Sequence, residues 1–261
     1  MNILDQIIAS KRKEIALKKS VIAINQLENT ALFNAKTHSL SKSILNSPFG
    51  IIAEHKRHSP SKGTINHSLS VEEVVTGYEN AGASGISVLT DSQYFGGSLD
   101  DLLLAKVAVN TPLLRKEFII DEYQILEAKA NGADAILLIA TVLTQAEIKS
   151  LSEFAHSIAL EVLLEVHNQE ELEKSIMPSL DIIGVNNRNL KTFEVSLQNS
   201  IDLIPHLPAD FVKISESGLS TIEDIKELQS HGFQGFLIGE SLMKTDNPGQ
   251  ALEQFINKLK V

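Results

Sequence analysis

The sequence of 261 residues contains no cysteine, and this absence removes several kinds of chemistry at once. Disulfide bonds, thiolate nucleophiles and thiolate metal ligands are all excluded. A chain without cysteine fits a reducing compartment, so we expect a cytoplasmic protein.

Long apolar runs and an excess of positive charge are missing as well. No run approaches the ~18 apolar residues of a membrane span, and the N-terminus lacks the apolar region of a signal peptide. The formal net charge is −10, which disfavours binding to nucleic acid or to an anionic membrane. An anionic substrate would therefore need a local basic pocket. The sequence also lacks a phosphate-binding loop of the Walker type and any histidine or acidic cluster with metal-ligand spacing, so we predict no metal site.

The dominant pattern is a series of eight short apolar runs separated by segments of helical length. Continuously apolar runs are typical of parallel strands that are covered on both faces. Eight such strand–helix units predict an α/β protein with a (β/α)8 TIM-barrel fold. An open doubly wound sheet is the alternative, but it requires a glycine-rich turn after the first strand, where this chain has Glu54-His55-Lys56. The eight runs span residues 51–53, 86–89, 112–114, 135–139, 162–164, 182–185, 211–214 and 235–238.

The N-terminal segment precedes this pattern and is expected to form helices. Residues 2–19 carry an apolar stripe that predicts a helix, and 20–47 are helical in places. We expect 1–47 to pack on a barrel formed by 48–261, so that 1–261 is a single domain. The basic residues of the first helix are interpreted as a solvated face: Lys11, Arg12, Lys13, Lys18 and Lys19.

Helix boundaries within the barrel are marked by local motifs. Capping boxes pair a serine or threonine with an acidic residue three positions later, and glycine commonly ends a helix. The predicted starts are Ser70 with Glu73, Ser98 with Asp101, Thr144 with Glu147 and Ser220 with Glu223, and the predicted ends are Gly82, Gly132 and Gly232.

Charged residues follow several of the predicted strands. In a barrel of this kind the catalytic groups lie where strands end and the following loops begin. Glu54 and Lys56 share one face of an extended chain, and His55 points the other way. Lys116 between Glu54 and Glu165 would suit a general acid, because neighbouring carboxylates keep a lysine charged. Structural ion pairs at strand ends are the alternative interpretation.

The last two strands are followed by small residues that suit a phosphate. Ser217-Gly218 and Gly239-Glu240 stand where backbone N–H groups can approach an anion, and barrels often bind phosphate after strands seven and eight. Tight turns without a ligand would explain the same glycines. The eight histidines match no site geometry and are interpreted as surface or packing residues: His38, His55, His58, His67, His156, His167, His206 and His231.

Seven segments together resemble the indole-3-glycerol-phosphate synthase family of tryptophan biosynthesis. They occur in the family's order over nearly the whole chain: IIAEHKRHSPSKG, SVLTDSQYFGGSLDDL, PLLRKEFIIDEYQI, EVLLEVHNQEEL, GVNNRNLKTFEV, KISESGL and GFLIGESLM. The resemblance implies a carboxy-lyase that closes the indole ring of 1-(2-carboxyphenylamino)-1-deoxyribulose 5-phosphate, with loss of carbon dioxide and water. It implies no cofactor, and we expect a monomer that acts on this small sugar phosphate.

The resemblance also implies roles for individual residues. Lys116 matches the general acid of ring closure, Glu165 the acid/base group of dehydration, and Glu54 the carboxylate that orients the substrate. Lys56 matches a residue that binds the anionic groups, and Asn186 one that holds hydroxyl and amine groups. The remaining implied contacts are Ser59 in the first loop, Phe95, Phe118 and Leu190 around the anthranilate ring, Arg188 near the carboxylate, Glu216 at the polar rim, and Ser217, Gly218, Gly239 and Glu240 around the phosphate.

Two other functions are compatible with the pattern of residues. One is another phosphate-binding barrel enzyme, such as phosphoribosylanthranilate isomerase, which needs an acid/base pair but no pocket for decarboxylation. The other is a phosphate-binding barrel without catalytic activity.

Overall fold

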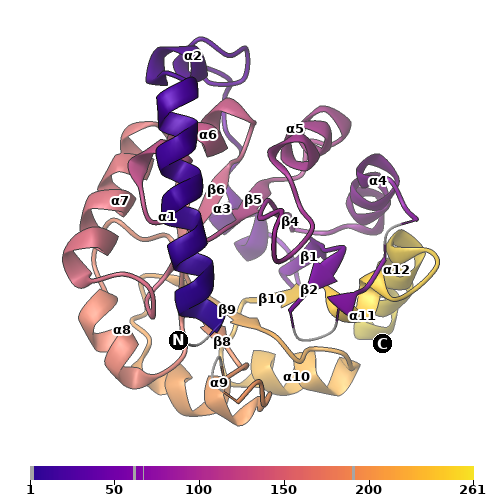
Figure 1. Ribbon diagram of the computed structural model, residues 1–261. Helices are drawn as coiled ribbons and strands as arrows, with labels where there is room; N and C mark the ends of the chain where they lie inside the picture. The colour runs from indigo at the N-terminus through magenta and orange to yellow at the C-terminus, as the bar shows by residue number, and fades with distance from the viewer. Residues whose placement is uncertain (1–2, 61–62, 67, 190–191) are drawn as a thin grey trace.

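Eight parallel strands close into a barrel that is surrounded by helices (Figure 1). The computed structural model describes residues 3–60, 63–66, 68–189 and 192–261. The strands follow the order β1-β10-β9-β8-β7-β6-β5-β4, which confirms the predicted (β/α)8 barrel. The barrel strands are β1 (Ile51–His55), β4 (Gly85–Leu89), β5 (Leu113–Lys116), β6 (Ala135–Ile139), β7 (Glu161–Val166), β8 (Ile182–Asn186), β9 (Val212–Glu216) and β10 (Gly235–Ile238).

Several strands extend further at their carboxyl ends than the apolar runs indicate. Lys116 is still paired with Leu89 of the neighbouring strand, and Asn186 with Glu216. These polar residues therefore belong to the strands and not to the loops that follow them. Because strand backbone is fixed by ladder hydrogen bonds on both sides, the side chains at this end of the barrel project from a rigid frame.

A small antiparallel hairpin in the first loop was not predicted. It consists of β2 (His58–Ser59) and β3 (Gly63–Thr64). Two polar residues are too few to produce a periodic signal, so pattern analysis cannot find such strands. The hairpin is fixed to the neighbouring loop, because Tyr94 O lies 2.8 Å from His58 Nδ1.

Helices cover the outside of the barrel and mostly begin and end where the motifs indicate. Ser70 and Thr144 form complete capping boxes, and the Ser98 side chain accepts the N–H of Asp101. The barrel helices are α4 (Val71–Ala81), α5 (Leu99–Ala108), α6 (Glu122–Ala130), α7 (Gln145–Ser157), α8 (Gln169–Ser175), α9 (Gln198–Leu203), the short 3-10 helix η1 (Ile204–His206), α10 (Ile222–Ser230), α11 (Glu240–Met243) and α12 (Pro248–Leu259).

The predicted start of α10 is wrong by one residue. Thr221 caps this helix together with Asp224, in place of Ser220 with Glu223. The segment offers two overlapping registers of the same motif, and the pattern alone does not distinguish them.

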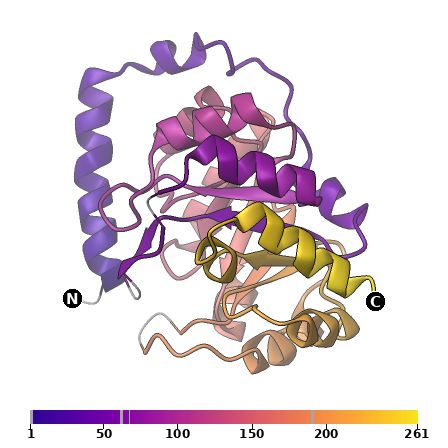
Figure 2. The same cartoon turned by 90° about the vertical axis from the view of Figure 1, so that its right-hand side faces the viewer.

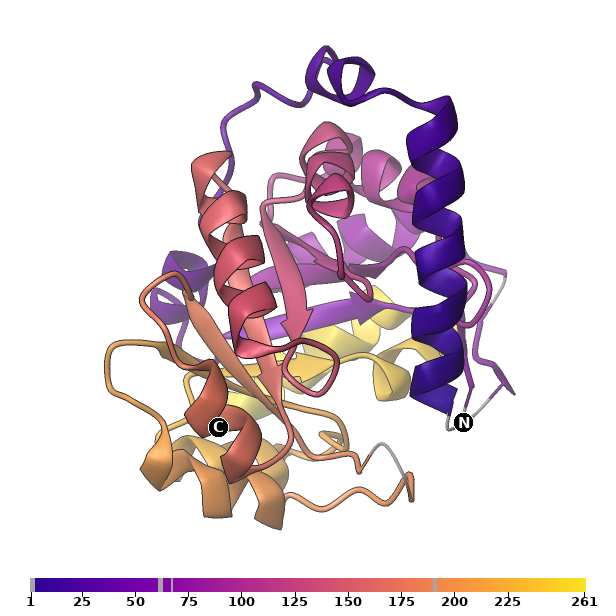
Figure 3. The same ribbon diagram turned by 60° about the vertical axis from the view of Figure 1, so that its left-hand side comes forward.

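The N-terminal extension packs against both ends of the barrel. Helix α1 (Ile3–Val21) lies across the carboxyl ends of the strands, and α3 (Leu40–Leu45) lies at the opposite end (Figures 2 and 3). The intervening segment, which includes α2 (Ile24–Glu28), passes along the outside of the barrel. Leu40 and Ile44 of α3 are fully buried against residues that point into the barrel, such as Ile52 and Leu114. Helix α3 thus closes the amino-terminal end of the barrel, whereas a pocket opens at the carboxyl end.

A helix that crosses a membrane has to be both long and apolar. None of the described helices combines the length and the apolar character that crossing a bilayer requires.

Candidate active site

A pocket of about 730 Å³ opens at the carboxyl ends of the barrel strands. The strands and the loops that follow them supply most of its lining, and α1 covers one side. The residues predicted to be catalytic all border it: Glu54, Lys56, Lys116, Glu165 and Asn186.

The deepest part of the pocket holds a cluster of three carboxylates and two amines. Lys116 Nζ is in contact with the carboxylate of Glu216 and lies 3.4 Å from Glu165 Oε2. Lys56 Nζ lies 2.6 Å from Glu54 Oε1. Charges this close in a buried site are strongly coupled, so the protonation of each group depends on the others.

The cluster sets the protonation of its members. Burial disfavours the charged form of Lys116, but Glu216, Glu165 and Glu54 outweigh it and raise the pKa. Burial also disfavours the charged form of Glu54, yet Lys56 and Lys116 lower its pKa. Burial raises the pKa of Glu216 to about 7, against the opposing effect of Lys116. Lys116 therefore stays charged and able to donate a proton, while Glu216 changes its protonation near neutral pH.

Glu216 lies deeper than the sequence analysis placed it. The interpretation was a residue at the polar rim, whereas the side chain is 1% exposed and contacts Lys116. Gly184 makes room for it, because a Cβ at this position would stand 2.3 Å from Glu216 Oε1. An isolated glycine within a strand is a known sign of close approach, so this signal was present in the sequence and was missed.

One side of the pocket is apolar. The rings of Phe95 and Phe118 stand 5.9 Å apart and are tilted by 40°. Asp91 holds the loop that carries Phe95, because its Oδ1 accepts the N–H groups of Tyr94 at 2.6 Å and Phe95 at 3.2 Å. Leu190, which was assigned to the same wall, lies outside the described residues. Helix α1 adds Ile3, Leu4 and Ile7 to the pocket, a contribution that the sequence pattern did not predict.

The other side of the pocket is polar. Asn186 Oδ1 accepts the N–H of Arg188 at 2.9 Å, which fixes the start of the loop after β8. The Arg188 side chain borders the pocket, 4.0 Å from Glu240 Oε2. Ser59 borders it from the first loop, and its side chain is buried.

The residues predicted to bind phosphate also line the pocket, at the loops after β9 and β10. Ser217 and Gly218 both adopt left-handed backbone conformations, with φ of 69° and 79°. Gly239 precedes α11, and a Cβ there would stand 2.7 Å from Glu54 Oε1. Lys244 borders the same end and was missed by the sequence analysis. Its Nζ lies 2.6 Å from Glu240 Oε1, so its positive charge stands at the turn after β10 and is shared with that carboxylate.

Comparison with known proteins agrees with this geometry. A family model described as indole-3-glycerol phosphate synthase matches residues 4–255. The chain is 49% identical over 259 residues to the indole-3-glycerol phosphate synthase of Bacteroides thetaiotaomicron, covering 99% of both chains. It is 44% identical over 251 residues to that of Neisseria meningitidis serogroup B, covering 94% of this chain and 96% of the relative. The chain belongs to the indole-3-glycerol phosphate synthase family.

Solved structures outside this family share the fold. A mutant tryptophan synthase alpha-subunit from Pyrococcus furiosus superimposes with a TM-score of 0.62 at 15% identity, covering 81% of this chain and 97% of that chain. A thiamine phosphate pyrophosphorylase from the same organism gives a TM-score of 0.59 at 14% identity, covering 85% and 98%. At such low identity these similarities establish the barrel alone.

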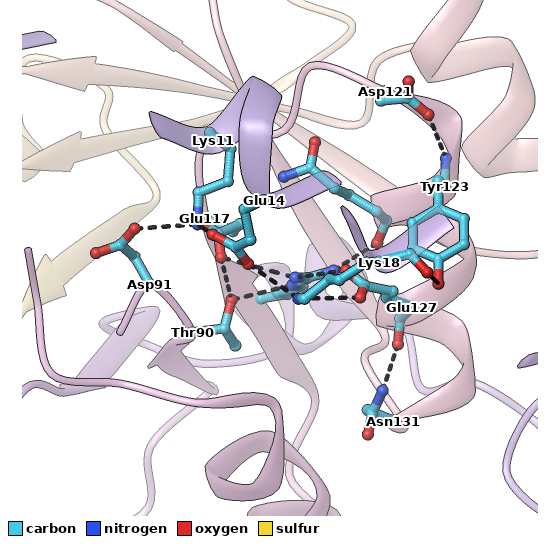
Figure 4. Close-up of polar contacts among 12 residues, drawn as sticks. Lys11, Glu14, Lys18, Thr90, Asp91, Glu117, Asp121, Tyr123, Glu127 and Asn131 are labelled. Atoms are coloured by element: carbon cyan, nitrogen blue, oxygen red, sulfur yellow. Dashed lines mark hydrogen bonds and ion pairs between the residues drawn. The ribbon is translucent and has the colours of Figure 1, made fainter. Parts of the chain in front are cut away.

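In this member of the family, α1 is fixed to the pocket by buried ion pairs (Figure 4). Lys11 Nζ lies 3.0 Å from Asp91 Oδ2 and 3.2 Å from Glu117 Oε1, and it donates to Glu14 Oε2 at 2.8 Å. About two turns further along α1, Lys18 Nζ lies 3.0 Å from Glu127 Oε1 of α6. The interpretation of the basic residues as a solvated face is wrong for Lys11, which is 2% exposed. Helix periodicity places Lys11 on the face of Ile7 and Ile15, and this was the available signal.

Among the histidines, which were interpreted as surface or packing residues, His167 lies beside a predicted catalytic residue. Its Nε2 lies 3.4 Å from Glu165 Oε1, and its Nδ1 lies 3.3 Å from Glu171 Oε2. His55, in contrast, is buried away from the pocket, as alternation predicts. Within the described ranges, no group of three or more histidine, aspartate or glutamate side chains is arranged to hold a metal ion.

Proposed function

We propose that this protein converts 1-(2-carboxyphenylamino)-1-deoxyribulose 5-phosphate into indole-3-glycerol phosphate, with loss of carbon dioxide and water. The observation that carries the proposal is the charged Lys116 among Glu165 and Glu216 at the bottom of the pocket. An apolar wall on one side and small backbone turns on the other suit the aromatic ring and the phosphate of this substrate. Membership of the family supports the same assignment.

The two ends of the pocket orient the substrate in this proposal. The phosphate binds at the turns of Ser217-Gly218 and Gly239-Glu240, near Lys244. The anthranilate ring lies against Phe95 and Phe118, which leaves its carboxylate for Arg188 and Lys56. The sugar chain then spans the cluster of carboxylates and amines, with Asn186 beside its hydroxyl groups. Fixing both ends of a flexible substrate removes much of the entropic barrier to ring closure.

Lys116 acts as the general acid of the first step. It donates a proton to the ketone oxygen while the ring carbon that bears the carboxylate attacks the ketone carbon. The anilino nitrogen supplies the electrons, so the step needs no electron-accepting cofactor. Carbon dioxide then leaves from the same ring carbon, and the aromatic ring is restored.

Glu165 acts in the dehydration that completes the indole. It protonates the hydroxyl group left by the former ketone, and the hydroxyl leaves as water while the nitrogen again supplies electrons. The neighbouring ring CH2 group then loses a proton, which gives the neutral indole, and Glu54, held by Lys56, orients the substrate and accepts this last proton.

An assay of the purified protein with this substrate tests the proposal directly. We expect indole fluorescence to appear, and Lys116→Ala to lower kcat by at least ~10², with substrate binding preserved within about tenfold. Lys213→Ala is the matched control, because Lys213 alternates to the outer face of β9 between the inward Val212 and Ile214. Absence of indole product at saturating substrate would reject the function. A non-catalytic barrel would bind ligand equally well with either substitution and would form no product.

We also propose that residues 1–47 and 48–261 act as a single domain, in a cytoplasmic monomer that takes no nucleic acid as partner. The buried contacts of Leu40 and Ile44 with the barrel interior support a single domain. The net charge of −10 supports the absence of a nucleic-acid partner. Size-exclusion chromatography with light scattering tests the monomer: a mass of twice 28.6 kDa would reject it.

A further inference from the structure

Glu54 has a direct neighbour on the next strand of the barrel. Its strand, β1, lies between β4 and β10, and Ser87 of β4 is its register partner in the parallel pairing of β1 with β4 (Figure 1). Ile86 and Val88, on either side of Ser87, belong to the apolar core that the strands share with the surrounding helices. Since side chains alternate along a strand, Ser87 points into the barrel, on the same face as Glu54.

The hydroxyl group of Ser87 is bound to the Glu54 carboxylate. Ser87 is 0% exposed, and its Oγ donates to Glu54 Oε2 at 3.3 Å. A buried hydroxyl group costs free energy unless it has a hydrogen-bond partner, and an ionised carboxylate is a stronger acceptor than a neutral oxygen. Ser87 does not border the pocket, so its effect on the substrate passes through its neighbours.

The Glu54 carboxylate is confined on three sides. Lys56 Nζ lies 2.6 Å from its Oε1, whereas Ser87 binds the other oxygen. Gly239 approaches from the turn after β10, where a Cβ would stand 2.7 Å from Oε1 and 2.9 Å from Glu54 Cβ. Lys56 is long and is also assigned to the anionic groups of the substrate, whereas Ser87 is short and belongs to a strand that ladder hydrogen bonds hold. Ser87 is therefore the partner that keeps its place when substrate binds.

The same contacts keep Glu54 ionised. Burial disfavours its charged form, but Lys56, Lys116 and the hydrogen bond from Ser87 lower its pKa. A carboxylate has to be ionised before it can accept a proton, and it has to lie within reach of that proton. Ser87 contributes to both conditions at one oxygen of Glu54.

We propose that Ser87 is a positioning residue, which directs the Glu54 carboxylate at the ring CH2 group that loses the last proton. In that step a C–H bond of the CH2 group breaks and an O–H bond forms at Glu54. The electrons that the nitrogen supplied during dehydration return to it, which gives the neutral indole. The inference rests on the proposed function, because this proton transfer belongs to the proposed reaction.

Deuterium in the substrate reports on this step. The label is placed on the CH2 group between the nitrogen and the ketone, because its C–H bond breaks only in the last proton transfer. We expect Ser87→Ala to lower kcat about tenfold, with a smaller change in KM, and to raise the isotope effect on kcat above that of wild type. A general loss of packing would slow turnover without raising the isotope effect.

A double-mutant cycle shows whether Ser87 acts through Glu54. Glu54→Gln removes the base, so adding Ser87→Ala to it should change the residual single-turnover rate by less than about twofold. Ser84→Ala is the matched control, because Ser84 is buried just before β4 and its Oγ has no hydrogen-bond partner in the described part of the chain. This control should keep the kcat and the isotope effect of wild type.

The outcomes separate this inference from the proposed function. Circular dichroism confirms that each variant is folded. If wild type forms indole product while folded Ser87→Ala keeps its kcat, or is slower with no rise in the isotope effect, the inference is overturned and the proposed function stands. An equal loss from Ser87→Ala in wild type and in Glu54→Gln overturns it in the same way. If wild type forms no indole product, the proposed function and this inference are both rejected.

Discussion

Replacing Lys11 by methionine tests whether α1 is held to the active site by buried charge. Lys11 is 2% exposed, and its two barrel partners, Asp91 and Glu117, are each 3% exposed. Burial disfavours the charge of Lys11, but Glu117, Glu14 and Asp91 raise its pKa, so the amine carries its charge at neutral pH. Methionine keeps the apolar stem and removes only this charge.

The expected loss of stability follows from the carboxylates that remain. Removing one partner of a buried ion pair costs 3–5 kcal/mol in general, because the other charge is left uncompensated. Here Arg115 NH2 still lies 3.6 Å from Glu117 Oε2, which retains part of the compensation. We therefore expect Lys11→Met to lower the free energy of unfolding by about 3 kcal/mol, the lower end of this range. Because Asp91 also holds the loop of Phe95, KM should rise more than kcat falls.

Urea unfolding monitored by circular dichroism measures the change, with steady-state kinetics on the same samples. Lys13→Met is the matched control, since Lys13 is an exposed lysine of the same helix, and we expect a change within ~0.5 kcal/mol. The double variant Lys11→Met with Glu117→Gln should recover part of the loss, because it leaves one fewer unpaired charge. A loss below ~1 kcal/mol for Lys11→Met, equal to that of the control, would refute the argument.

Three further predictions concern other positions in the barrel. Burial lowers the pKa of His55 from 6.5 to about 4. The neutral imidazole therefore contributes ~3 kcal/mol to the free energy of unfolding above pH 6.5, and this contribution is lost as the pH falls through 4. His55→Gln should flatten the dependence of the urea midpoint on pH between these values, and an unchanged slope contradicts the prediction. Gly184→Ala should displace the Glu216 carboxylate and lower kcat at least ~10-fold, which a wild-type rate would disprove. Gly218→Ala should weaken phosphate binding, because the φ of Gly218 is 79° and a Cβ there would stand 2.3 Å from the Val195 side chain. We expect KM to rise about tenfold, and an unchanged KM argues against a phosphate site at this turn.

The strand pattern predicted the barrel because each strand is covered on both faces. Apolar runs such as 135–139 and 235–238 coincide with β6 and β10 residue for residue. The rule that active sites lie at the carboxyl ends of barrel strands then selected Glu54, Lys116 and Glu165, and all three border the pocket. The positions of these three residues in the pocket follow from the apolar runs and from the order of strands and helices, and both are visible in the sequence.

Contacts that depend on the N-terminal extension could not be predicted in the same way. The apolar stripe of α1 predicts that the helix packs on the barrel, but it does not specify where. Lys11 and Ile7 reach the active site because the segment between α1 and α3 passes along the outside of the barrel and so lets the two helices lie at opposite ends. Because this connecting segment has no periodic pattern, its path could not be predicted from the sequence. The contact of Lys11 with the active site could therefore not be predicted either.

The pairing of Lys116 with Glu216 shows a second limit, which is set by the closure of the barrel. Strands β5 and β9 are four positions apart in a ring of eight, so they face each other across its axis. Alternation predicts that both side chains point inward, but it does not show which inward groups meet, because that depends on the barrel's diameter and on the length of each side chain. Lys116 was predicted to lie between Glu54 and Glu165, yet its closest partner is the carboxylate of Glu216 on the opposite strand. Since a contact across the axis needs space, the glycine at 184 was the most direct evidence for it: the strand next to β9 omits a side chain where Glu216 turns inward.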